Sequence, residues 1–129
     1  AIHVFCLQER LRGERFARHW HDIARLDEAG LAEAAFADRD LANAVATYKS
    51  MFFAEKAANG TEIDYGAAVN GHLYLVPDGK ASEALEDDYR RMVDDGLLLE
   101  DAENFGTLME RCSDVAKRAN RSARLTQEE

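Results

Sequence analysis

The chain has 129 residues, of which 47% are hydrophobic and 32% charged, and its formal net charge is −9. This length suits one domain with a core of its own, and the composition excludes a disordered segment. The acidic balance excludes diffuse attraction to nucleic acid as the main source of binding, and no apolar run reaches the length of a membrane span.

Apolar residues recur at helical spacing through most of the chain. We expect five helices, over residues 2–11, 14–29, 41–55, 83–95 and 102–121, and a short helical piece over 31–35. The connections are short, which predicts an all-α antiparallel helical bundle forming a single domain over residues 1–121. Residues 122–129 are predicted to be a flexible tail.

Several residues suit the ends of these helices. Gly30 fits the left-handed position just past a helix end, and Asp38 or Asp40 can cap the helix at 41–55. Ser82 and Asp101 are the predicted caps of the last two helices.

Each helix has a stripe of apolar residues that we expect to face the core. The stripe of the helix at 14–29 is Phe16, Trp20, Ile23 and Leu26. That of the helix at 41–55 is Leu41, Val45, Tyr48, Met51 and Phe52. The last two helices contribute Leu85, Tyr89, Met92, Phe105, Leu108, Met109, Cys112, Val115 and Ala119.

The segment 61–78 breaks this helical pattern. Glycines interrupt it, and an apolar run leads into Pro77, the single proline of the chain. One strand would have no partner, so we expect an extended loop held against the helices by Tyr65, Leu73 and Leu75.

The helix at 2–11 begins with apolar residues on several sides, among them Ile2, Val4 and Phe5. A short helix cannot hide all of these against one bundle, which predicts a weak homodimer through this helix. Cys6 and Cys112 lie in apolar helical patterns and are interpreted as buried free thiols, typical of the reducing cytoplasm.

The densest group of polar residues is the run RFARHWHD at 15–22. His19 and Asp22 are three apart and therefore share one helix face. The alternative is that Asp22 only forms surface ion pairs with Arg18 and Arg25. His19 and His21 are two apart and do not face each other, so we expect no metal site built from this chain.

A basic cluster occupies the first quarter of the chain, at Arg10, Arg12, Arg15, Arg18 and Arg25. A solvated helix face explains it better than a nucleic-acid patch. No phosphate-binding glycine loop or nucleophile elbow is present, and neither cysteine has an electropositive context that would activate it.

Four segments resemble, in order and spacing, the AbiEii-type nucleotidyltransferases of abortive-infection, or type IV toxin–antitoxin, systems. Residues 18–26 (RHWHDIARL) resemble the family's R-H-Y-Y-D-L-x-x-L segment, and residues 48–53 (YKSMFF) its K-x-x-F-[FY] helix. Residues 71–77 (GHLYLVP) resemble its G-x-L-x-L-x-P loop, and residues 85–92 (LEDDYRRM) its L-x-x-D-Y-x-x-M helix.

The resemblance implies roles for three residues. Asp22 matches the aspartate of the family's D-L pair and would be catalytic, facing the nucleotide or the metal-bound phosphates. Arg18 and His19 would be nucleotide-binding. Trp20 and His21 depart from the pattern, because the family has tyrosines there.

The resemblance also implies which parts lie elsewhere. Family members carry an N-terminal core whose G-S-x-x-x-x-D-like motif supplies carboxylates for Mg²⁺ and the nucleoside triphosphate, and this motif does not occur here. The chain is therefore expected to be the C-terminal helical part of such an enzyme, inactive and without cofactors alone. Joined to that core, it would take part in transfer of a nucleotide to an acceptor.

The partners that the resemblance implies are the N-terminal core, an antitoxin, and an RNA end or a protein hydroxyl as acceptor. The alternative function is a stand-alone helical protein-interaction module without catalysis.

Overall fold

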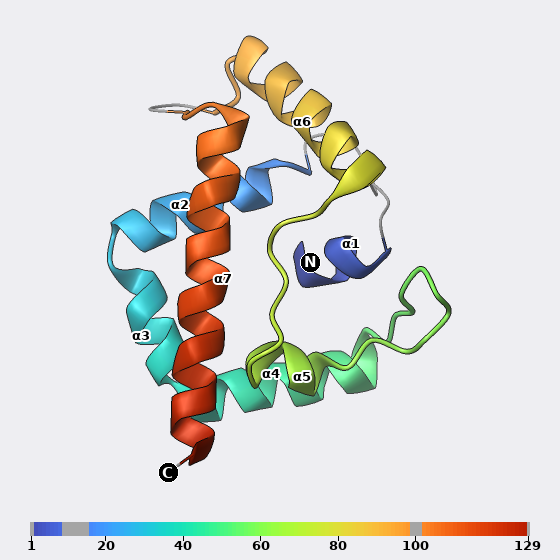
Figure 1. Cartoon of the computed structure of the whole chain (residues 1–129), viewed down its shortest axis with the longest axis vertical. Coiled ribbons are helices and arrows are strands. Elements are labelled where there is room, and N and C mark those ends of the chain that lie inside the picture. The colour runs from blue at the N-terminus through green and yellow to red at the C-terminus, as the bar shows by residue number, and fades with distance from the viewer. Residues whose placement is uncertain (1, 9–15, 99–101, 129) are drawn as a thin grey trace.

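The computed structural model describes residues 2–8, 16–98 and 102–128, which form seven helices and no strand (Figure 1). The helices are α1 (Ile2–Gln8), α2 (Arg18–Glu28), α3 (Leu31–Ala37), α4 (Arg39–Phe52), α5 (Tyr65–Val69), α6 (Gly79–Asp94) and α7 (Phe105–Glu128). The all-α prediction is confirmed. The described residues form two more helices than the five predicted, because the piece at 31–35 is a full helix and α5 interrupts the loop at 61–78.

The long helix α7 is the axis on which the other helices are arranged (Figure 1). The pair α2 and α3 packs along it, α6 meets it near its start and α5 also contacts it, while α4 packs against α5 and α3. No helix in the described part of the chain combines the length and apolar character needed to cross a bilayer.

The core forms where α1, α2, α6 and α7 meet. Its largest fully buried side chains are Trp20, Phe5, Leu85, Leu108 and Cys112. The rings of Phe5 and Trp20 meet edge to face with centroids 5.2 Å apart, an arrangement that adds to the burial of aromatic area. The inward faces predicted for α6 and α7 are confirmed, apart from Phe105 and Ala119, which are only partly buried.

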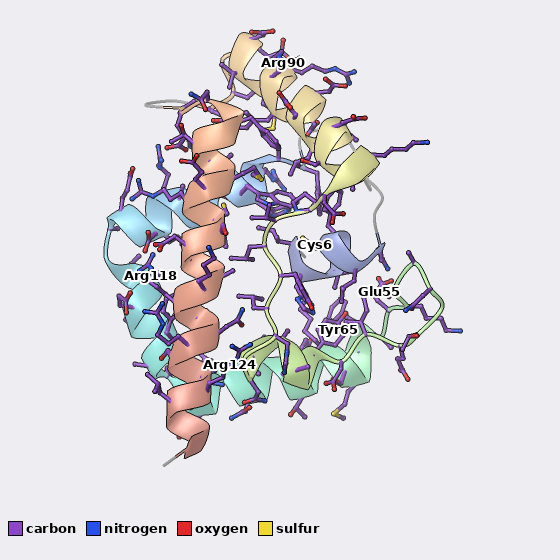
Figure 2. The ribbon with its side chains drawn as sticks, in the orientation of Figure 1. Cys6, Glu55, Tyr65, Arg90, Arg118 and Arg124 are labelled. Atoms are coloured by element: carbon purple, nitrogen blue, oxygen red, sulfur yellow. The ribbon has the colours of Figure 1, made fainter. Side chains whose placement is uncertain are left out.

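An extended segment over residues 72–78 passes through the middle of the molecule (Figure 1). The predicted extended loop is confirmed for this part of residues 61–78. The Trp20 indole Nε1–H donates to the Leu75 carbonyl at 2.7 Å, and the Asn120 amide bonds both backbone groups of Leu73. Arg124 reaches from α7 and donates to the Gly71 carbonyl at 2.8 Å (Figure 2). Side chains thus satisfy backbone groups that have no strand partner.

Tyr65 holds the neighbouring part of this loop in a different way from that predicted. It is the first residue of α5, which Asp64 caps by accepting from the Ala67 N–H at 3.0 Å. The Tyr65 hydroxyl donates to the Phe53 carbonyl at 2.6 Å and so ties α5 to the end of α4.

The predicted starts of two helices, α6 and α7, need correction. Asp38 caps α4 as expected, but α6 begins at Gly79, so Ser82 lies inside the helix. The buried Ala81 draws this first turn onto the core. Asp101 lies outside the described residues, and Asn104 accepts from the Thr107 N–H at 2.8 Å at the start of α7.

Helix α7 continues through residues 122–128, most of the segment predicted to be a flexible tail. This stretch contains no glycine or proline, and Ala123 is buried. The domain boundary predicted at residue 121 therefore falls within a helix whose packing extends beyond it.

Three apolar residues of α1 are buried within the fold, contrary to prediction, and Cys6 and Leu7 are half-buried. Ile2, Val4 and Phe5 each expose less than a tenth of their surface, because α1 lies against Trp20 and the extended segment. Leu11 lies outside the described residues. Ile2, Val4 and Phe5 therefore leave little apolar surface for the predicted dimer through this helix, which itself stays a prediction.

The stripe of α4 shows the opposite error. Its large apolar residues face solvent rather than the core, with exposed fractions of 58% at Leu41 and 68% at Met51. The helix packs instead through small residues, because Ala46 is buried and Ala42 half-buried. Spacing grouped these side chains on one face correctly but assigned that face to the wrong environment.

Candidate functional site

Helix α2 carries the residues that the sequence singled out, and two contacts fix its position. The buried Asp88 of α6 accepts from the Ala17 N–H at 2.8 Å, which places a carboxylate at the positive end of α2. On another face of α2, the fully buried Trp20 holds the helix in place by donating a hydrogen bond to the Leu75 carbonyl. The remaining face, formed by His19, Asp22, Ile23 and Leu26, is turned toward α3.

This face of α2 forms one wall of an open cavity of about 660 Å³. The other walls come from α1, α3, α7 and the extended segment, and include Ile2, Leu31, Phe36, Leu73 and Val115. Among the described residues, three ionisable side chains line the cavity, namely His3, His19 and Asp22. The site is therefore an apolar hollow with a few polar groups, the usual composition of a small-molecule pocket.

The two histidines of the cavity favour the neutral form. Burial lowers the pKa of His3 to about 4, and its Nδ1 accepts from the Tyr74 N–H at 3.0 Å, which requires an unprotonated nitrogen. Burial and then the Arg18 charge lower the pKa of His19, while Asp22 acts in the opposite direction. A neutral imidazole can both donate and accept a hydrogen bond from a ligand.

Asp22 is exposed at the cavity and is not engaged by the flanking arginines. The Arg25 guanidinium lies 2.6 Å from Glu103 and 3.2 Å from Glu28, and within the described residues neither Arg18 nor Arg25 forms an ion pair with Asp22. The interpretation of Asp22 as half of a surface ion pair is therefore wrong, and its carboxylate can accept bonds from a ligand.

Arg18 does not belong to the cavity. Its side chain is exposed and lies outside the cavity lining, although it is one residue from His19. Arg10, Arg12 and Arg15 of the basic cluster lie outside the described residues. The structure thus brings together two of the three predicted site residues and separates the third.

The next histidine, His21, points away from the cavity into the interior. It is buried, and its Nδ1 lacks a hydrogen-bond partner among the described atoms. The prediction that His19 and His21 do not share a site is confirmed by this difference.

The described residues offer neither a metal centre nor an activated thiol. They contain no group of three or more histidine, cysteine, aspartate or glutamate side chains able to hold a metal ion. Cys6 and Cys112 are free, as predicted, and burial raises the pKa of each thiol to about 12.

Two parts of the cavity were not predicted. Helix α3 closes one side with Leu31, Ala32, Ala35 and Phe36, and α1 adds His3. In the sequence, α3 shows only an apolar run and His3 is a lone histidine. Neither signal indicates which residues far along the chain these parts will contact.

Comparison of the chain with models of protein families, with curated proteins and with solved structures gives no match.

Proposed function

We propose that this chain is the helical C-terminal portion of an AbiEii-type nucleotidyltransferase, and that the α2–α3 cavity contacts the nucleotide. The observation that carries the proposal is the position of His19 and Asp22. The family resemblance singles out these two residues, and both line the apolar cavity beside α2.

The cavity suits the base and sugar of a nucleotide. Its volume of about 660 Å³ falls in the range of small-molecule sites, roughly 300–1,000 Å³. Apolar side chains such as Ile23 and Phe36 can cover a planar base. Beside them, the Asp22 carboxylate and the His19 imidazole can bond ribose hydroxyls or the polar edge of the base.

The triphosphate and Mg²⁺ do not fit the described residues. No cation lines the cavity, the Asp22 carboxylate would repel phosphates, and no metal-binding cluster is formed. We therefore assign these groups to the catalytic core of the complete enzyme and expect no nucleotide transfer by this chain alone. The acceptor, an RNA end or a protein hydroxyl, and an antitoxin partner belong to the same proposal.

Nucleosides without phosphates test this assignment on the 129-residue chain. We expect titration with each of the four ribonucleosides, followed by ¹H–¹⁵N NMR, to shift the amide signals of Asp22, Ile23 and Phe36 for at least one of them. Ala35→Phe, which fills the cavity, should abolish the shifts, whereas Ala34→Phe, next to it but outside the lining, should leave them. Absence of shifts with all four nucleosides, or shifts that survive Ala35→Phe, would contradict the proposal.

The second candidate, a helical protein-interaction module, is favoured by the exposed apolar face of α4. This face is separate from the cavity, because no α4 residue is among the described residues that line it.

A further inference from the structure

An apolar stripe runs along the outer face of α4, which lies at the edge of the molecule (Figure 1). The stripe consists of Leu41, Ala44, Val45, Tyr48, Met51 and Phe52. These positions are spaced three and four apart, so they form one continuous face. The five larger members are between 47% and 68% exposed.

The opposite face of α4 explains why this stripe is left uncovered. Ala46 is the buried residue of the helix, and Arg39 holds α5 by donating to the Val69 carbonyl and, at 3.2 Å, to Asn70 Oδ1. The helix is therefore anchored by small and polar residues, while its large apolar residues leave about half or more of their surface exposed. Burying them instead against this fold would require turning the helix and breaking these contacts.

We propose that the α4 stripe is the interface of a homodimer, in which α4 of one copy packs antiparallel against α4 of a second copy around a two-fold axis. This inference does not rest on the proposed nucleotide function.

The size of the stripe suits a weak dimer. An aromatic side chain has roughly 150–250 Å² to bury, so Tyr48 and Phe52 each expose on the order of 100 Å². With the aliphatic members, each copy offers on the order of 500 Å², and a pair buries about 1,000 Å². This is the lower limit for a specific interface.

Side-chain size favours the antiparallel direction. The N-terminal half of the stripe holds the smaller residues, Leu41, Ala44 and Val45, and the C-terminal half holds the larger Tyr48, Met51 and Phe52. An antiparallel pair sets the large half against the small half and keeps an even separation. A parallel pair would place the large side chains of both copies against each other at one end. It would also align the two helix dipoles in the same direction, which is unfavourable.

Charge favours this face over others for contact between copies. The chain carries a net charge of −9, which opposes self-association in general. Between Asp40 and Lys49, however, α4 carries no charged residue. Two copies can therefore approach along this stripe without bringing carboxylates together. Added salt should strengthen the pairing, because it screens the repulsion between the other negative charges of the two copies.

Sedimentation equilibrium of the 129-residue chain at concentrations from 10 to 500 µM, about the range of a weak dimer, tests the proposal. We expect a reversible dimer that strengthens with salt. Leu41→Glu should raise the dissociation constant at least about tenfold. Leu125→Glu is the matched control, because Leu125 is equally exposed, at 57% against 58%, but lies on α7. Circular dichroism should show that both variants fold.

A monomer at every concentration would overturn the proposal and would point to a different protein as the binding partner of the stripe. A dimer that Leu41→Glu weakens no more than Leu125→Glu would overturn it as well. The direction is tested by oxidising an equal mixture of Leu41→Cys and Phe52→Cys chains. Antiparallel pairing predicts mainly the mixed disulfide, whereas mainly Leu41→Cys homodimers would contradict it.

Discussion

The side-chain amide of Asn120 pairs with the backbone of Leu73 as a neighbouring β-strand would. The Leu73 N–H donates to Asn120 Oδ1 at 2.8 Å, and Asn120 Nδ2 donates to the Leu73 carbonyl at 3.1 Å. One α7 residue thus satisfies both groups of a residue in the extended segment, which also forms part of the cavity wall.

Replacing this amide should therefore loosen the segment. We expect Asn120→Ala to lower the free energy of unfolding by roughly 1–3 kcal/mol, because two partly buried backbone groups lose their partner. Urea denaturation measures the loss, and hydrogen exchange at the Leu73 amide should become faster. Asn43→Ala, at an exposed position of α4, is the control. Equal effects of the two substitutions would show that the Asn120 bonds contribute little.

Arg118 joins three helices, whereas Arg90 stays within one (Figure 2). The Arg118 guanidinium lies 2.7 Å from Asp27 of α2 and 2.5 Å from Glu33 of α3. Removing it leaves the mostly buried Asp27 carboxylate poorly compensated, so Arg118→Ala should destabilise the fold by roughly 1–3 kcal/mol. Among the described residues, Arg90 pairs with Glu86 and Asp87 on the surface of α6, and Arg90→Ala should change little. Similar midpoints of thermal unfolding for both variants would refute this difference.

His3 should make the fold sensitive to mild acid. Its pKa is about 4 in the folded chain and about 6.5 when unfolded, so between these values the unfolded state binds more protons. Stability from this group is complete above pH 6.5 and declines as the pH falls toward 4, by as much as ~3 kcal/mol.

The measurement is the free energy of unfolding from pH 4 to 7 in the original chain and in His3→Asn. Asparagine keeps an acceptor for the Tyr74 N–H but does not titrate in this range, so the variant should show a shallower pH dependence. Replacing His72, an exposed histidine, by asparagine should leave the slope unchanged. An identical slope in all three chains would rule out His3 as the source.

The sequence predicted the parts of the fold that depend on local spacing. The inward faces of α6 and α7 were correct because residues such as Leu85 and Leu108 recur with the helical period and meet the core. The same rule failed for α4, because a stripe tells which side chains share a face but not what covers that face. Tyr48 and Met51 carry the same signal whether a core or a second molecule lies opposite.

The cavity could be predicted only in part for a related reason. The spacing of His19 and Asp22 placed both on one face of α2, which the structure confirms. The contributions of His3 and Phe36 depend on contacts between residues far apart in the chain. These contacts are set by how α1 and α3 pack, which no local pattern encodes.

The most direct test of the proposed function is the effect of Asp22→Asn on nucleotide transfer by the protein that joins this chain to a nucleotidyltransferase core. Transfer from labelled triphosphates to RNA and to protein would be measured beside Asp87→Asn, an exposed acid on the remote helix α6. We expect Asp22→Asn to lower turnover at least about tenfold, the loss of one charged hydrogen bond, with an unchanged melting temperature. Asp87→Asn should have no effect. Turnover that is unchanged by Asp22→Asn would contradict the account.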